Sequence, residues 1–236
     1  MEFVAAATSG EVGRRAAGVA VLPIGSFEQH GSFLPLGTDT VVASAIAGRI
    51  SAENDLFLLP PVTISCSHEH SAFPGTVSIS AGTLAAVVRD IAASLDRSGV
   101  TKLVLVNGHG GNYVLSNVAQ EANVGARRML LFPGRADWDA ARAAGGLVTS
   151  TSADMHAGEL EVSILLAVRP DLVGAAYADP ASDTDAPDRP DLLMLGMQAY
   201  TRNGVIGRPS LGTAAKGHAV LDSLSRSFRP HVVLLA

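Results

Sequence analysis

Apolar runs and helical patterns alternate along the first two thirds of the chain. Runs rich in Val, Leu and Ile predict buried parallel strands over residues 18–24, 56–64, 102–108 and 128–133. Apolar residues at helical spacing predict helices over residues 39–54, 80–99, 112–128 and 157–168. Such alternation is typical of a three-layer α/β/α fold, so we expect a mostly parallel central sheet between helices.

The length of 236 residues fits one domain, because a second independent core would be cramped. We therefore expect residues 1–236 to form a single domain. The segment 177–191, rich in Asp, Pro and Ala, predicts a surface loop or an arm that contacts another subunit. Active sites of α/β folds lie at the carboxyl ends of the strands, so the polar residues that follow each predicted strand are the candidates for function.

Composition narrows the possible partners. Hydrophobic residues make up 47% of the chain and charged residues only 17%, which predicts a partly neutral surface engaged with other subunits, and hence a homo-oligomer. The net charge is −5 and the basic runs are short, so nucleic acid is not an expected partner. The sequence has neither a signal peptide nor an apolar stretch of the roughly 18 residues that span a bilayer. We expect a cytoplasmic protein without a membrane partner.

The motif "GSFEQHG" directly follows the first predicted strand and places Glu28 and His30 two positions apart. If the extended conformation continues, both side chains project from one face and could meet one ion. Asp39 stands at the start of the next helix, where taken alone it is more simply an N-cap. Cys66 is the single cysteine, so a metal ion here would need nitrogen and oxygen ligands.

A second polar motif, "VNGHGGN", ends the third predicted strand and carries His109. Its glycines allow a sharp turn, and His109 would project into the same crevice as the first motif. A phosphate-binding loop is the alternative. The motif lacks the GxGxxG register and the lysine of a Walker loop, which disfavours that alternative.

The third motif, "DMHAGELEVS", contains Asp154, His156, Glu159 and Glu161. A helix here would place Glu161 in its first turns and His156 just ahead of it. The simpler interpretation is a helix with acids at its N-terminus, which leaves His156 without a role. Taken together, the three motifs indicate a dinuclear hydrolase centre for Zn²⁺, Mn²⁺ or Fe²⁺, in which one carboxylate is shared by both ions.

These motifs, in this order, resemble the signatures of the creatininase family. The resemblance also includes "SHEHSAFPGTVS" and "NGVIGRPSLGTAAKGHAVL" and covers roughly residues 18–225. It implies a creatininase-like fold, a homo-hexamer and cleavage of a C–N amide-type bond. It further implies two divalent metal ions, zinc first and manganese or iron as alternatives, with the ligands Glu28, His30, Asp39, His109 and Glu161. Asp39 would bridge the ions.

Two departures from the family pattern bear on the substrate. Creatinine-hydrolysing members carry a loop glutamate in "NGHYEN", where this chain has Gly111, and Glu161 is expected to replace it as a ligand. They also have a tryptophan just before the catalytic histidine, whereas the single tryptophan here is Trp138. Creatinine is therefore not the expected substrate. Other branches deformylate a pyrimidine intermediate or trim the C-terminal dipeptide of a precursor peptide, so a cyclic amide, a formamide or a short peptide is expected.

The predicted mechanism is hydrolysis by a metal-activated water, whose pKa falls from about 15.7 toward 7. His156 is the predicted proton shuttle, since an imidazole pKa near 6.5 allows transfer in both directions. The candidates for substrate binding are Ser67, Glu69, His70 and Trp138. For Glu69 and His70, packing against the site is an equally good interpretation.

Two alternatives come from other functional classes. One is a non-catalytic, metal-binding assembly subunit that keeps the fold, against which stands the presence of five ligands and the shuttle in one chain. The other is a nucleotide-binding oxidoreductase, for which a nucleotide should raise the melting temperature.

Overall fold

A computed structural model describes residues 7–15 and 18–235. The expectation that the chain has no leader segment rests partly on residues 1–6, which lie outside the described residues. The strands are β1 (Val19–Ile24), β2 (Phe57–Leu58), β3 (Lys102–Asn107) and β4 (Met129–Phe132). The α-helices are α1 (Ser9–Arg15), α2 (Thr38–Asn54), α3 (Ala81–Arg97), α4 (Val114–Ala122), α5 (Arg135–Ala144), α6 (Glu159–Val168), α7 (Leu192–Leu195) and α8 (Ala214–Leu235). Short 3₁₀ helices include η1 (His68–His70) and η6 (Pro209–Leu211).

The strands form one parallel sheet in the order β2-β1-β3-β4. β1 and β3 pair in register from Val19 opposite Lys102 to Ile24 opposite Asn107. Their carboxyl ends therefore lie side by side, which brings the two loops that follow them to one edge of the sheet. This confirms the expected parallel sheet and the expected position of the polar motifs.

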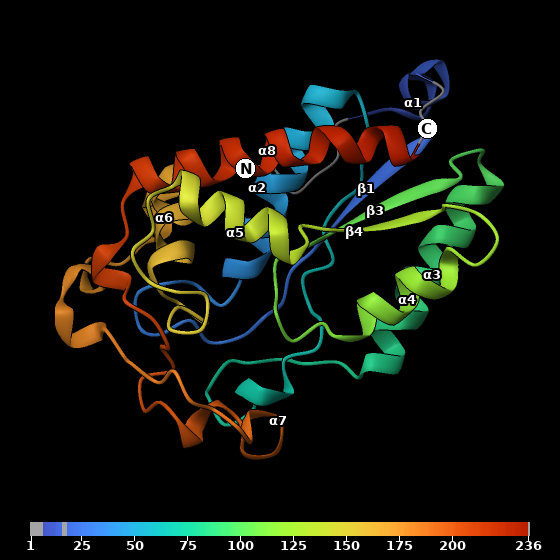
Figure 1. The fold of residues 1–236 in the computed structure, drawn as a ribbon. Helices are drawn as coiled ribbons and strands as arrows, with labels where there is room; N and C mark the ends of the chain where they lie inside the picture. Colours follow the sequence, from blue (N-terminus) through green and yellow to red (C-terminus); the bar gives the residue numbers. More distant parts are fainter. Residues whose placement is uncertain (1–6, 16–17, 236) are drawn as a thin grey trace.

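Strand side chains alternate between two hydrophobic cores. Val21 and Val104 face a core built with α2, α5, α6 and α8, whereas Leu22 and Leu105 face a second core built with α3 and α4. This is the period of two that an extended chain imposes, and burial on both faces explains why the central residues of the strands are apolar. Figure 1 shows the two helix layers on opposite sides of the sheet, so the three-layer α/β/α prediction is confirmed.

Two of the predicted elements differ from the observed ones in extent by several residues. The strand predicted over 56–64 is regular only in β2, because Pro60 and Pro61 have no N–H to donate to the ladder. Pairing with β1 resumes where the N–H of Val62 donates to the carbonyl oxygen of Pro23 at 2.9 Å. The helix predicted over 112–128 ends early, in a turn that contains Gly125 at φ +83°. The pattern also failed to indicate α1, α5 and α8.

The start of α3 follows the prediction closely. The Ser80 hydroxyl accepts a hydrogen bond from the backbone N–H of Thr83 at 3.1 Å, as an N-cap does. The helix ends at Arg97, and Gly99 follows with φ +88°, a value that favours glycine.

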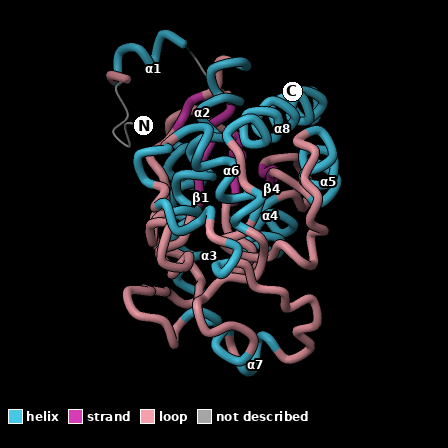
Figure 2. The backbone as a smooth tube through the Cα atoms, turned by 90° about the vertical axis from the view of Figure 1, so that its left-hand side faces the viewer, coloured by secondary structure: helices cyan, strands magenta, loops and turns pink. Residues whose placement is uncertain are grey.

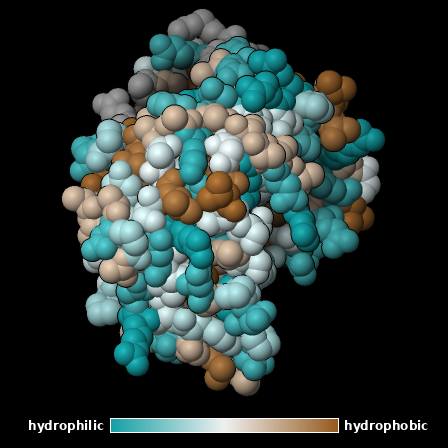
Figure 3. Space-filling view, turned by 60° about the vertical axis from the view of Figure 1, so that its left-hand side comes forward, coloured by the Kyte–Doolittle hydropathy of each residue, from teal (hydrophilic) through white to brown (hydrophobic). Residues whose placement is uncertain are grey.

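Loops collect at one end of the molecule. Figure 2 shows them at the end opposite α1, with α7 among them. On the face shown in Figure 3, hydrophobic residues form small separate groups among hydrophilic ones. Leu193 and Met194 of α7 are more than three quarters exposed, at 76% and 77%. Within residues 7–15 and 18–235, none of the helices has both the length and the apolar character that a membrane span requires.

Candidate metal centre and active site

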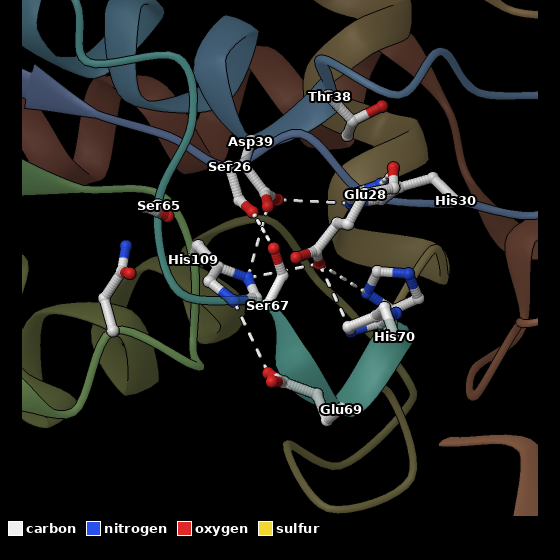
Figure 4. Close-up of polar contacts among 12 residues, drawn as sticks. Ser26, Glu28, His30, Thr38, Asp39, Ser65, Ser67, Glu69, His70 and His109 are labelled. Carbon is white, nitrogen blue, oxygen red and sulfur yellow. Dashed lines mark hydrogen bonds and ion pairs between the residues drawn. The ribbon is translucent and has the colours of Figure 1, made fainter. Parts of the chain in front are cut away.

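Two glycines let the loops after β1 and β3 approach the start of α2. A β-carbon at Gly25 would lie closer than 3.0 Å to the backbone of Thr40, and one at Gly108 would lie equally close to the carbonyl oxygen of Asp39. Only glycine permits such approaches without displacing the helix. The close packing brings Glu28, Asp39 and His109 together, and Figure 4 shows their side chains pointing toward one another.

Asp39 is the central carboxylate of this cluster. It is almost fully buried, with Oδ1 3.1 Å from Nε2 of His30 and Oδ2 3.2 Å from Nδ1 of His109. The interpretation of Asp39 as an N-cap is wrong. Gly37 occupies the cap position of α2, and Asp39, two residues further on, turns its carboxylate toward the two imidazoles.

Three histidines share one arrangement. In each, one ring nitrogen lies against a backbone carbonyl oxygen: His30 Nδ1 on Glu28 at 3.1 Å, His109 Nε2 on Cys66 at 2.8 Å, and His156 Nε2 on Gln29 at 2.6 Å. A carbonyl oxygen only accepts hydrogen bonds, so that nitrogen carries the hydrogen. The other nitrogen faces the carboxylates, and without a proton it directs its lone pair there, which is the usual arrangement of a metal-binding histidine.

The carboxylate of Glu28 lies among the ring nitrogens that face the cluster. Its Oε1 is 3.2 Å from Nδ1 of His109 and 3.7 Å from Nδ1 of His156. Glu28 is completely buried, and within the described part of the chain no contact of its oxygens has the geometry of a hydrogen bond. A buried carboxylate without hydrogen bonds costs several kcal/mol unless a cation compensates it, roughly as for any isolated buried charge. The donor set therefore fits divalent metal ions.

The ligand atoms form two triads that share Asp39. Glu28, Asp39 and His109 make one, His30, Asp39 and Glu161 make the other, and within each the ligand atoms lie within 4.8 Å of one another. The structure thus brings together all five residues that the sequence named as ligands. It also brings His156 into a third group with Glu28 and His30.

Electrostatics in the metal-free protein show how strongly this cluster attracts positive charge. Burial alone would lower the pKa of His30, but Asp39 and the nearby Glu161 and Glu28 raise it to about 9. Burial likewise opposes a charge on His109, yet Glu28 and Asp39 raise its pKa well above the ordinary value. A metal ion bound there would displace these protons.

His156 differs from the other two anchored histidines. Its burial lowers its pKa well below the ordinary value, and the neighbouring imidazoles of His30 and His70 add to the effect. His156 is therefore a neutral base at neutral pH, and the expectation of a pKa near 6.5 is corrected. The lone pair on Nδ1, rather than a titrating charge, is what this residue offers.

Sequence reasoning missed the part played by Gln29. Its side-chain amide donates to Nδ1 of His70 at 3.0 Å and to the carbonyl oxygen of Gly204 at 2.9 Å. Its carbonyl oxygen also holds His156. One buried residue thus fixes two imidazoles, and the signal was its place between Glu28 and His30 in the first motif. With Nδ1 as acceptor, His70 carries its hydrogen on Nε2, 3.3 Å from Glu28.

The loop that carries His156 is held by a buried ion pair. Asp154 binds Arg142 at 3.0 Å and accepts the backbone N–H groups of Glu159 and Leu160, so it caps α6 from outside the helix. Glu159 turns away from the cluster and binds Lys216. The capped-helix interpretation therefore holds for Asp154 and Glu159.

Glu161, by contrast, faces the cluster. Its Oε2 lies 3.9 Å from Nε2 of His30 and accepts the N–H of Ala157 at 2.6 Å. Burial raises the pKa of Glu161 to about 7, although His30 opposes the shift.

A cavity of about 760 Å³ opens over the cluster. Glu69, His70, His109, His156 and Glu161 line it from the cluster side. The same cavity is also lined by Pro187, Asp188, Arg189, Pro190 and Leu192, so the segment 177–191 does more than cover the surface. Sequence reasoning missed this wall, because nothing in a Pro- and Asp-rich loop shows where it folds back.

Two of the four residues named for substrate binding lie elsewhere. Ser67 is completely buried, with its hydroxyl 2.8 Å from that of Ser26 (Figure 4). Trp138, on α5, packs against the hydrophobic core on the α8 side of the sheet. Neither is among the described residues that line the cavity, and their role in substrate binding stays a prediction. Glu69 and His70 do line it.

Comparison with known proteins gives consistent matches. A family model described as creatininase, creatinine amidohydrolase, matches residues 5–230. A mycofactocin precursor peptide peptidase of Mycolicibacterium smegmatis is 34% identical over 86% of this chain and 80% of its own length. A creatinine amidohydrolase of Pseudomonas putida is 30% identical over 66% of each chain.

Solved structures agree in fold. A creatininase in its Mn form has a TM-score of 0.77 at 24% identity and covers 96% of this chain and 95% of that one. A creatininase mutant of the Zn-Zn type has a TM-score of 0.75 at 23% identity, with 94% and 92% coverage.

Proposed function

This chain belongs to the creatininase family and is a hydrolase of carbon–nitrogen bonds, and we propose that it cleaves an amide bond of a short peptide at a two-metal centre. The proposed ligands are Glu28, His30, Asp39, His109 and Glu161, with Asp39 shared between the ions. The observation that carries this proposal is the pair of triads that share Asp39, each of which directs one imidazole nitrogen at the Asp39 carboxylate.

Charge supports a pair of ions rather than one. The three carboxylates of Glu28, Asp39 and Glu161 would offset three of the four positive charges on two divalent ions, which leaves the centre attractive to an anionic group. Such ions, when bound, acidify a water molecule and polarise a carbonyl oxygen. Zinc is the proposed metal, with manganese or iron as alternatives, and related creatininase structures are described in Mn and Zn-Zn forms.

His156 is the proposed proton carrier of this reaction. Its Nε2 hydrogen stays on the carbonyl of Gln29, so the ring has a fixed orientation and Nδ1 is the atom free to accept a proton. The same nitrogen would return the proton to the leaving amine. Because His156 also lies within reach of Glu28 and His30, its proton transfer would take place directly beside the ions.

Three observations favour a peptide over creatinine. The loop glutamate of creatinine-hydrolysing members is Gly111 here, and Trp138 is remote from the cavity. A volume of about 760 Å³ has room for several residues of a peptide, since drug-sized ligands occupy roughly 300–1,000 Å³. The relatives that match over 86% of this chain are named as peptidases of a precursor peptide.

The test is metal analysis together with a substrate panel. Protein loaded with zinc or manganese should hold about two ions per chain and release amines from peptides of three to six residues. Creatinine and a formylaminopyrimidine complete the panel. Faster hydrolysis of either one than of any peptide would contradict the peptide proposal. Stoichiometric metal without turnover would favour the non-catalytic assembly subunit.

We also propose a cytoplasmic homo-oligomer, a hexamer by resemblance to the family. The exposed apolar side chains of α7 support contact with other subunits. Light scattering on the purified protein tests the assembly, and a monomer at micromolar concentration would contradict it.

A further inference from the structure

The segment 187–190, which lines the cavity together with the proposed metal ligands, carries a cationic side chain. Arg189 stands between Asp188 and Pro190, and it is the one Lys or Arg among the described residues that line the cavity. The prolines at 187 and 190 fix the backbone φ on either side of it. Arg189 is half-buried, so its position is defined by neighbouring chain rather than by solvent.

Two backbone carbonyl groups hold the guanidinium. One terminal nitrogen donates to the carbonyl oxygen of Ser152 at 2.9 Å, and the other donates to that of Ala186. Carbonyl oxygens orient an arginine without neutralising it. Within the described chain no carboxylate lies within 4.0 Å of Arg189, and the adjacent Asp188 acts on its charge only from a longer distance.

The other charges that line the cavity limit what Arg189 can bind. Glu69 and Asp188 also line it and would repel an anionic ligand. An arginine fork fits a carboxylate with two parallel hydrogen bonds, a geometry that neutral carbonyls cannot replace. A negatively charged group of the substrate would therefore gain most from contact with Arg189.

We propose that Arg189 is a specificity-determining residue that binds a carboxylate of the peptide substrate. The carboxylate is either the C-terminal one or an acidic side chain, since both offer the same pair of oxygens. This inference rests on the peptide hydrolysis proposed above. It assigns the segment 187–190 to substrate selection, with the scissile amide at the metal ligands and the anionic group at Arg189.

The experiment compares matched peptides: a free acid, its C-terminal amide, and a pair that differs by Glu against Gln within the chain. The wild type should prefer one acidic form by about 10- to 100-fold in kcat/KM, through KM. Whichever pair shows the preference identifies the source of the carboxylate. Arg189→Gln should abolish the preference and leave the neutral peptide and the metal content unchanged, and Arg189→Lys should retain part of it.

Arg208→Gln is the control, because Arg208 binds Asp185 of the same loop at 2.7 Å and does not line the cavity. It should keep the preference. Equal losses on acidic and neutral peptides in Arg189→Gln would show a merely structural role and overturn the inference, as would the absence of any preference in the wild type.

Calorimetric binding of the same peptides separates this inference from the function it rests on. If no peptide is cleaved, the proposed function fails. In that case, tighter binding of an acidic peptide that Arg189→Gln removes would still support the carboxylate site, and equal binding of all peptides would overturn it.

Discussion

Glu69 places its carboxylate oxygen Oε1 in the space that a β-carbon on Gly111 would need. The same β-carbon would also lie closer than 3.0 Å to Nε2 of His109. By the family resemblance, creatinine-hydrolysing relatives would carry a glutamate at this position, and in this chain a side chain at position 111 and the observed place of Glu69 exclude each other. The observed position of Glu69 in the cavity wall therefore requires glycine at position 111.

Gly111→Ala should therefore disturb the metal centre. We expect a loss of about 1–3 kcal/mol in the free energy of unfolding, as for other overpacked sites, and a roughly 10- to 100-fold weaker metal affinity through His109. Gly110→Ala is the matched control, since a β-carbon there meets no described atom within 4 Å. Thermal melts and metal titrations of both variants check this, and equal behaviour would contradict it.

His156→Gln should separate chemistry from metal binding. If His156 carries the proton, kcat should fall by at least about 100-fold while both ions remain bound. Asp39→Asn provides the contrast, because loss of the shared carboxylate should remove metal and activity together. Elemental analysis beside steady-state kinetics decides between them. Loss of metal from His156→Gln would instead make this residue a ligand, as its proximity to Glu28 and His30 allows.

Metal-free protein should lose stability as the pH rises from 6.5 to 9. The pKa of His30 is about 9 in the folded chain against 6.5 unfolded, so the proton stabilises the fold below pH 6.5 and its contribution is lost through pH 9. The difference is on the order of 3 kcal/mol. Metal-loaded protein should not show this fall, because metal replaces the proton. Melting temperatures of chelator-treated and loaded protein test it, and a parallel fall in both would refute it.

Gln29→Leu should damage two histidines at once. The substitution leaves Nδ1 of His70 and the carbonyl oxygen of Gly204 without their donor, which costs about 1–3 kcal/mol for each buried group. We expect lower stability and lower kcat, with the backbone anchor of His156 retained. Gln120→Leu, at an exposed position of α4, is the control and should be near neutral. Unfolding in urea with parallel kinetics measures both.

The fold can be predicted from the sequence where the local hydrophobic pattern agrees with burial in the structure. The central residues of β1, β3 and β4 are apolar because both faces of the sheet are covered, and that pattern is visible in the sequence alone. The prediction of the second strand over 56–64 is too long, because two prolines allow only part of this apolar run to pair with β1. α8 escaped notice, since its apolar residues are interrupted by Pro230 and by polar stretches that only tertiary packing explains.

The candidate site divides in the same way. Residues directly after strand ends, such as Glu28 and His109, could be named because topology fixes where strand ends meet. Arg189 could not, because its position depends on a long loop that folds back over the cavity. Trp138 was named for its rarity alone, and rarity does not determine which face of α5 a residue occupies.

The hydrogen bond from His109 Nε2 to the backbone carbonyl oxygen of Cys66 limits what mutagenesis can show about this histidine. The anchor is a peptide oxygen, so no amino-acid replacement deletes it, and a library that varies position 66 would report only how well each side chain packs in the core. The orientation of the His109 imidazole is therefore set by the backbone conformation at residue 66. Replacement of the amide bond after Cys66 by an ester would test how far His109 depends on this carbonyl group.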